Sequence, residues 1–186
     1  MKLYELKFEI NPDDKEKIIR GFGLEYSRQY TDIDHFIETK NNTKLKYKEV
    51  EGRTIKYILD FNEQTGLFEI EDEELTENFA KIQEIKRMKV IKVMGRTKEV
   101  YLWPGKKVRV SFDSINEIKD KLFCEIYDKD EAAVFEAKGK MVEFGFTRFI
   151  NKTYDELITK TYSIINLLII IVIMAVIAFI AYNIIK

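Results

Sequence analysis

The sequence predicts an α+β fold, in which a closed antiparallel β-barrel with flanking helices is followed by one apolar C-terminal helix. Segments of alternating apolar and charged residues indicate strands, because side chains on a strand alternate between its two faces. In Lys2–Ile10, positions 4, 6, 8 and 10 are apolar, whereas Glu5, Lys7 and Glu9 share the opposite face. Roughly eight such strands, joined by tight turns and accompanied by few helices, favour a barrel that holds one small ligand.

The first half of the chain continues from this strand into a short helix. Asn11 suits a helix N-cap and Pro12 suits the first helical position, so a helix is expected over Asp13–Phe22, with glycines at its end. A loosely defined strand is expected near Leu24–Ile37, and Glu51-Gly52 is a hairpin-type turn. The other strands of this half are expected at Lys44–Val50, Arg53–Phe61 and Leu67–Glu71.

The second half alternates helices and strands. Leu75–Met88 has apolar residues at helical spacing, which predicts an amphipathic helix. Val90–Trp103 has the pattern of a long strand, in which Gly95 suggests a β-bulge, and Pro104-Gly105 turns the chain back. Further strands are expected at Lys107–Asp113 and Leu122–Tyr127, and further helices at Asp130–Phe144 and Thr153–Tyr162.

The C-terminal run Ile164–Ile185 carries no charge and is long enough to span a bilayer as a helix, which takes about 20 apolar residues. It lacks the polar stripe that a buried core helix would show. Tyr162 and Tyr182 lie near its ends, where aromatic rings suit the membrane interface. We therefore expect a barrel domain at residues 1–162 and a single-pass membrane anchor at residues 163–186, with the barrel facing the cytoplasm.

Composition excludes several classes of function. The 186 residues carry a net charge of −1, which gives no reason to expect nucleic acid as a partner. Trp103 and the tyrosines show no basic–aromatic stacking pattern either. Cys124 is the single cysteine and His35 the single histidine, so neither an intramolecular disulfide nor an ordinary zinc site is expected. The N-terminal strand is charged and lacks the apolar core of a signal peptide.

Basic residues gather on one face of several strands. They recur at every second position in Lys44, Lys46 and Lys48, and again in Arg96 and Lys98. A solvated antiparallel sheet also alternates, so one such strand is uninformative. Several of them together predict a basic lumen that binds a polyanion.

Six stretches resemble one protein family in their order and spacing, from residue 1 to about residue 160. They are YELKFEI at Tyr4–Ile10, TKLKYKEVEG at Thr43–Gly52, RTKEVYLW at Arg96–Trp103, VRVSFDSI at Val108–Ile115, FCEIY at Phe123–Tyr127 and KTYDELI at Lys152–Ile158. On these stretches the chain resembles the CYTH family of triphosphate tunnel enzymes, and most closely its class IV adenylyl cyclase branch. The resemblance implies the same barrel, a triphosphate ligand, and Mg²⁺ or Mn²⁺ as cofactor.

The resemblance also implies which residues form the site. The triphosphate-binding cations would be Lys7, Lys46, Lys48, Arg96, Lys98 and Arg109. The metal ligands would be Glu5, Asp113 and Glu125. Carboxylate oxygens suit these hard cations, and a metal ion stabilises charge on a transferring phosphoryl group. No residue is assigned here as an acid, base or nucleophile.

Three positions depart from the family pattern. Leu3 stands where the first glutamate of the N-terminal E-x-E-x-K would be, and Tyr127 replaces the second glutamate of the late E-x-E. In Tyr57–Phe61, Leu59 and Asp60 stand where a lysine is expected. The three remaining carboxylates can hold one divalent ion. Binding of two ions at once, and with it turnover of the ligand, is put in question.

Two functional hypotheses follow, and a third remains. The first is a membrane-anchored tunnel protein with metal-dependent hydrolysis or cyclisation of a nucleotide or inorganic triphosphate. The second is a non-catalytic module, tethered to the membrane, that captures polyphosphate or nucleotide without turning it over. The third is a membrane-tethered scaffold that binds no small molecule. A homodimer is compatible with any of them.

Overall fold

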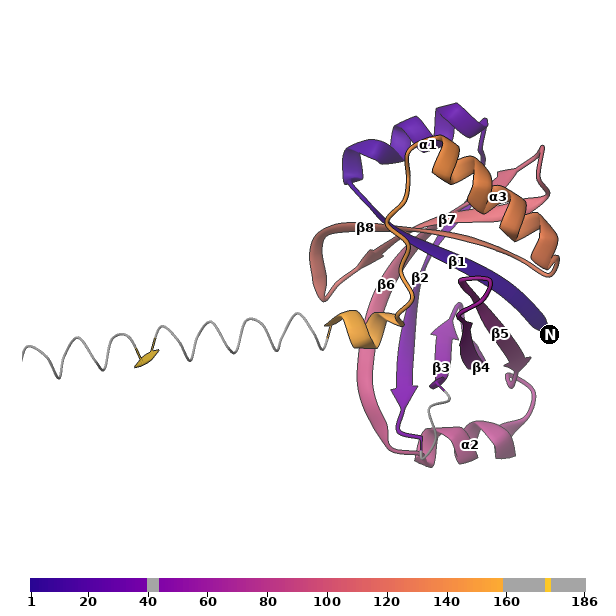
Figure 1. Cartoon of the computed structure of the whole chain (residues 1–186). Coiled ribbons are helices and arrows are strands. Elements are labelled where there is room, and N and C mark those ends of the chain that lie inside the picture. The colour runs from indigo at the N-terminus through magenta and orange to yellow at the C-terminus, as the bar shows by residue number, and fades with distance from the viewer. Residues whose placement is uncertain (40–43, 159–172, 175–186) are drawn as a thin grey trace, which may run out of the picture. The chain divides into compact units, whose positions relative to one another are not determined.

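The alternating segments form strands, and the strands close into a barrel in the order β1-β5-β4-β3-β2-β6-β7-β8 (Figure 1). All neighbouring strands pair antiparallel. The computed structural model describes residues 1–39, 44–158 and 173–174. The strands in this part are β1 (Lys2–Ile10), β2 (Glu25–Ile37), β3 (Lys44–Val50), β4 (Arg53–Asn62), β5 (Leu67–Glu74), β6 (Val90–Trp103), β7 (Val108–Ile115) and β8 (Ile118–Asp128).

Two of the described helices, α1 and α2, begin later in the chain than predicted. The described helices are the 3₁₀ turn η1 (Pro12–Asp14), α1 (Lys15–Phe22), α2 (Phe79–Arg87) and α3 (Glu131–Glu143). Asn11 occupies the N-cap position of η1 and Pro12 its first position, as predicted. The Asn11 side chain makes no capping bond to the backbone, however, and instead donates to Asp14 Oδ2 at 3.2 Å. α2 does not start at Leu75, because Asn78 caps it by accepting a hydrogen bond from the Lys81 backbone N–H.

Gly95 does not form a β-bulge, which corrects another prediction. Its pairing with Ile33 is regular, and the register shifts of the β2–β6 pair lie elsewhere. A Cβ atom at this position would lie 2.5 Å from Nδ2 of Asn116, so a larger residue would displace the Asn116 amide. The turn between β7 and β8 packs against β6 here, and Asn116 donates its backbone N–H to the Gly95 carbonyl.

The barrel buries apolar residues on its outer face beneath the helices. The even positions of β1 and β7 pack there with α1 and α3, and Phe8, Phe112 and Val134 belong to this core. A smaller core beneath α2 includes Tyr47 and Ile85. Because the outward positions are apolar and covered, the alternate positions must face the lumen.

The chain divides into two units, Met1–Asn151 and Lys152–Lys186. The second unit is helical at residues 154–158. The predicted anchor at residues 163–186 lies outside the described residues, except for Ile173 and Met174. No helix in the described ranges combines the length and apolar character needed to cross a bilayer. The predicted domain boundary after residue 162 and the predicted anchor stay predictions.

Candidate functional site

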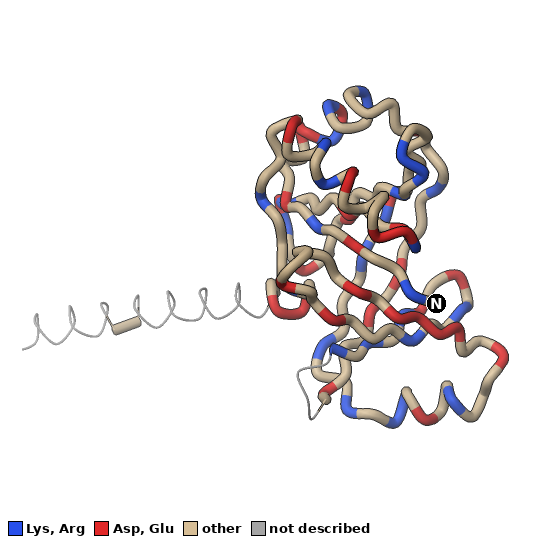
Figure 2. The backbone as a smooth tube through the Cα atoms, turned by 45° about the vertical axis from the view of Figure 1, so that its right-hand side comes forward, with Lys and Arg blue, Asp and Glu red and all other residues tan. Residues whose placement is uncertain are grey.

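Charged side chains fill one side of the lumen, which we call the charged wall. Its members come from six strands and are all buried: Glu5, Lys7, Asp32, Asp34, Lys46, Lys48, Arg96, Lys98, Asp113 and Glu125. Figure 2 shows Lys, Arg, Asp and Glu along the strands of the barrel. Among the described residues of Met1–Asn151, five buried cations thus face five buried carboxylates. These ten residues therefore carry no net formal charge when all of them are ionised.

Arg96 on β6 lies at the centre of this network. Its Nε donates to Asp32 Oδ1 at 3.0 Å and its Nη2 donates to Asp32 Oδ2 at 2.9 Å, which is a bidentate pair. Its Nη1 donates to Asp113 Oδ2 at 2.8 Å and lies 3.5 Å from Glu125 Oε1. One guanidinium therefore joins carboxylates from β2, β7 and β8.

Each buried lysine also has a close carboxylate. Lys46 Nζ lies 2.7 Å from Asp34 Oδ2, and Lys48 Nζ lies 2.9 Å from Asp32 Oδ2. Lys7 Nζ lies 2.7 Å from Glu5 Oε1 on the same strand. The remaining buried lysine, Lys98, donates to Glu125 Oε2 at 2.5 Å and lies 3.5 Å from Asp113 Oδ2.

Sequence analysis missed Asp32 and Asp34. The signal was present, because the two aspartates lie two residues apart in a strand pattern, with Ile33 between them. In the structure the β2–β3 register sets Asp34 opposite Lys48, and the β2–β6 register sets Asp32 opposite Arg96. We expected a mostly basic lumen. The two aspartates of β2, added to the three predicted carboxylates, bring the number of buried carboxylates up to that of the buried cations.

The opposite side of the lumen is apolar, and we call it the apolar wall. It consists of Leu3, Tyr57, Leu59, Phe61, Phe68 and Ile70 from β1, β4 and β5. Leu3 and Leu59 both pair in register with Ile70. Two of the three departures from the family pattern, an expected glutamate and an expected lysine, are therefore neighbours in one apolar cluster.

The third departure, Tyr127, lies on the charged wall's side of the barrel. Lys98 Nζ lies 5.0 Å from the centre of its ring, within the range of a cation–π contact. Burial raises the pKa of Tyr127 to about 12, so its phenol stays protonated at neutral pH. It therefore cannot supply the charge of the carboxylate that it replaces.

Arg109 is the one predicted cation that the structure does not bury with the others. It is exposed near the start of β7, opposite Tyr127 in the β7–β8 register. By alternation it shares a face with Ser111 and Asp113. This places Arg109 at the end of the lumen rather than within it.

A small cavity separates the two walls. It measures about 40 Å³ and touches both, with Lys7, Lys46, Lys48, Arg96 and Lys98 among its lining residues. Such a volume holds very few water molecules. A triphosphate chain is much larger, so its entry requires the ion-paired side chains of the charged wall to move.

Burial and neighbouring charge act differently on two adjacent lysines. Burial lowers the pKa of Lys46 to about 8, because repulsion from Lys48 and Arg96 adds to it and outweighs the attraction of Asp34. Burial also lowers the pKa of Lys48, but Asp34 and Asp32 together outweigh it and raise that pKa above its usual value. Lys46 is therefore the buried lysine of this pair that loses its proton most easily.

The carboxylates show the same competition. Burial raises the pKa of Asp32, but Arg96 and Lys48 outweigh it and hold the pKa well below its usual range. Burial and repulsion from Glu125 raise the pKa of Asp113 to about 6, despite Lys98 and Arg96. The charged wall is thus a coupled set of ion pairs rather than a set of independent charges.

The three predicted metal ligands offer oxygen donors of the right kind but are engaged with cations. Glu5 pairs with Lys7, while Asp113 and Glu125 pair with Arg96 and Lys98. Across the described ranges, no group of three or more histidine, cysteine or acidic residues is arranged to hold a metal ion. The arrangement does not fit a preformed Mg²⁺ or Mn²⁺ site, and the metal stays a prediction.

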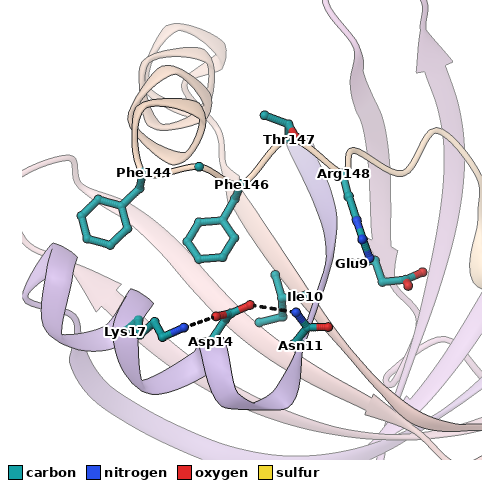
Figure 3. A pocket seen from close by; sticks show the side chains of 10 residues that line it. Glu9, Ile10, Asn11, Asp14, Lys17, Phe144, Phe146, Thr147 and Arg148 are labelled. Carbon is teal, nitrogen blue, oxygen red and sulfur yellow. Dashed lines mark hydrogen bonds and ion pairs between the residues drawn. The ribbon is translucent and has the colours of Figure 1, made fainter.

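A second hollow lies outside the lumen, between the start of α1 and the segment after α3 (Figure 3). It measures about 350 Å³, and Phe144 and Phe146 line it together with charged residues of both signs. Asp14 there accepts hydrogen bonds from Asn11 and Lys17. Its volume exceeds that of the lumen cavity, but it lacks the five converging cations, so the lumen is the stronger candidate for a polyanion.

The comparisons with known proteins concern the fold. No family model matches the chain, and no curated protein matches it. Among solved structures, the PH1012 protein from Pyrococcus horikoshii OT3 matches with a TM-score of 0.66 and 19% identity, over 84% of this chain and 99% of the other. A candidate adenylate cyclase from Vibrio parahaemolyticus matches with a TM-score of 0.62 and 16% identity, over 84% and 97%.

A candidate adenylyl cyclase from Hippeastrum, described as having a dominant triphosphatase activity, also matches. The TM-score is 0.59 and the identity 12%, over 87% of this chain and 96% of the other. These similarities are structural, and at such identities they establish architecture alone. Together with the strand order, they confirm the predicted closed eight-stranded antiparallel barrel with flanking helices, which has the triphosphate tunnel fold.

Proposed function

We propose that this barrel binds a triphosphate-containing small molecule or a polyphosphate in its lumen. The observation that carries the proposal is the convergence of Lys7, Lys46, Lys48, Arg96 and Lys98 on one internal cavity. Burying ionised groups is unfavourable unless they are paired, and a cluster of buried ionisable groups around one cavity is a candidate binding site. The triphosphatase described for the Hippeastrum structure supports the same ligand class.

Capture without turnover is the form of this function that the geometry favours. Glu5, Asp113 and Glu125 each contact a cation, and Tyr127 and Leu3 remove two carboxylates that the family resemblance implies. Hydrolysis or cyclisation with Mg²⁺ or Mn²⁺ is the second candidate, supported by the activities named for structural neighbours. In that case the metal would enter together with the triphosphate.

Calorimetric titration of the full chain with inorganic triphosphate, ATP and thiamine triphosphate tests the proposal. We expect binding of at least one of them, and a tenfold or larger increase in Kd for Lys98→Met. The matched control is Lys2→Met, because Lys2 forms an exposed pair with Glu69 and should leave Kd unchanged. A folded wild-type chain that binds none of the three would contradict the proposal.

The same samples separate capture from turnover. Release of orthophosphate with Mg²⁺ or Mn²⁺ would mark a hydrolase, and release of pyrophosphate with a cyclic nucleotide would mark a cyclase. Binding without either product would establish the capture function. Circular dichroism of each variant shows whether a lost signal reflects binding or unfolding.

We also propose that the run Ile164–Ile185 anchors the barrel to a membrane, with the barrel on the cytoplasmic side. The support is the uncharged sequence of that run. Flotation of the full chain with liposomes tests it, and Ile170→Lys with Ile177→Lys should abolish flotation because charged residues oppose insertion. Equal flotation of both proteins would count against an anchor.

A further inference from the structure

Two aspartates on β2 hold three of the five buried cations. Asp34 Oδ2 lies 2.7 Å from Lys46 Nζ. Asp32 lies 2.9 Å from Lys48 Nζ and accepts both hydrogen bonds of the bidentate Arg96 pair. The exposed fractions of Asp34 and Asp32 are 0% and 2%, so solvent does not share in screening these pairs.

The strand fixes these contacts. Ile33 lies between the two aspartates and points to the outer face, so Asp32 and Asp34 share the lumen face. Both neighbouring strands present cations in register, with Lys48 opposite Asp34 and Arg96 opposite Asp32. Neither carboxylate can leave the lumen without a change in the register of β2, which would reverse the faces of its side chains.

Because of this geometry, the carboxylates contact the same ammonium and guanidinium groups that a phosphate chain would need. We propose that Asp32 and Asp34 are specificity-determining residues, which act as an internal counter-anion that an incoming polyanion must displace from Lys46, Lys48 and Arg96. This inference rests on the proposed function, because it concerns how the same lumen selects its ligand.

The consequence is a selection by charge. A ligand with one or two phosphate groups replaces few of the existing ion pairs and meets the repulsion of both aspartates. A triphosphate offers enough oxygens to pair with several cations at once. Asp34 Oδ1 accepts no hydrogen bond from the described residues, so part of its charge is already unsatisfied in the lumen.

Removing one of these charges should therefore strengthen binding, which is the opposite of what a ligand-contacting residue would do. Asparagine keeps the size of aspartate and still accepts a hydrogen bond, but carries no charge. We expect Asp34→Asn and Asp32→Asn to bind inorganic triphosphate at least tenfold more tightly than the wild type. Binding of pyrophosphate should increase by a larger factor, so the preference for the longer chain should shrink.

Titration calorimetry of the full chain with inorganic triphosphate and with pyrophosphate measures both effects. Asp34→Asn is the milder variant, since Asp34 lies 2.7 Å from Lys46 and 3.8 Å from Arg96, whereas Asp32 lies 2.9 Å from both Lys48 and Arg96. Thermal unfolding with and without triphosphate gives a second readout. At the same triphosphate concentration, a variant that binds triphosphate more tightly should gain more stability from it than the wild type does.

The control is Asp60→Asn, because Asp60 is exposed on β4 and should not alter either affinity. If the wild type binds triphosphate and both lumen variants bind it equally or less tightly, the counter-anion inference is wrong while the proposed function stands. If neither the wild type nor the variants bind any phosphate chain, both fail.

Discussion

The charged wall and the apolar wall are built from the same alternating strands, yet one buries ionised groups and the other excludes them. On the charged wall every buried cation lies within 3.0 Å of a carboxylate oxygen. On the apolar wall Leu3, Leu59 and Ile70 meet across three strands. The contrast shows that a buried cation in this lumen occurs together with a carboxylate that pairs with it, and that where one is absent the other is absent too.

The apolar wall shows why a single charged residue would be unfavourable at position 3 or 59. If Leu59 alone were a lysine, its charged side chain would pack against Ile70 and Phe68, which offer it no partner. If Leu3 alone were a glutamate, its carboxylate would lie beside the same apolar residues. With leucine at both positions the cluster stays apolar, and the five buried cations line the cavity from the charged wall only.

The largest expected effect on this contrast comes from Arg96→Met. The change leaves Asp32 and Asp113 buried without their principal partner, which should lower the free energy of unfolding by about 3–5 kcal/mol. Urea denaturation of the full chain measures it. For comparison, Lys2→Met removes an exposed ion pair and should leave stability nearly unchanged. Equal effects of the two would mean that the charged wall does not stabilise the fold.

The fold could be predicted from sequence because alternation reports directly which face of a strand is buried. The same alternation placed Lys7, Lys46, Lys48, Arg96 and Lys98 on inward faces, where the structure has them. Their role in binding stays a prediction. Element ends were less predictable, as α2 shows, because Leu75 continues the apolar spacing of the helix but donates its backbone N–H to Thr54 instead.

The balance of charge in the lumen could not be predicted in the same way. Which carboxylate meets which cation depends on the register of β2 with β3 and β6, and β6 lies far from β2 in the sequence. The apolar wall could not be predicted either, because it too depends on which strands are neighbours in the barrel. Leu3 and Leu59 lie far apart in sequence, and only the insertion of β5 between β1 and β4 makes them neighbours.

A smaller effect is expected from Leu59→Ala on the apolar wall. Leu59 is 4% exposed, and truncating a buried leucine costs about 2–5 kcal/mol through lost contacts and a residual cavity. Urea denaturation should show this loss. Triphosphate affinity should change much less than in Lys98→Met, because no charge is removed. A large loss of affinity in Leu59→Ala would show that the apolar wall contacts the ligand.

Introducing a charge at both Leu3 and Leu59 tests whether opposite charges in this lumen stabilise each other. Leu3→Glu and Leu59→Lys should each destabilise the chain, because each places one ionised group in this apolar cluster. The double variant should recover about 1 kcal/mol relative to the sum of the two, since residues that share a site couple by roughly 0.5–3 kcal/mol. Strictly additive effects would show that the two positions do not form a pair.

The smallest expected effect is a dependence of triphosphate affinity on pH, which arises from Lys46 and not from Lys48. Lys46 has a pKa of about 8, so its charge is present below that pH and is lost as the pH rises through it. Lys48 keeps its charge throughout, because its pKa is raised. The affinity for triphosphate should therefore weaken several-fold between pH 7 and pH 9.

Lys46→Arg is the matched variant, because arginine stays protonated over this range and should flatten the pH profile. The free energy of unfolding should change with pH in the opposite direction to the affinity for triphosphate. The unfolded chain binds the Lys46 proton more tightly, so this group opposes folding most below pH 8, and its unfavourable contribution fades as the pH rises toward 10.5. A profile that is the same in wild type and Lys46→Arg would place the titrating group on the ligand or elsewhere in the lumen.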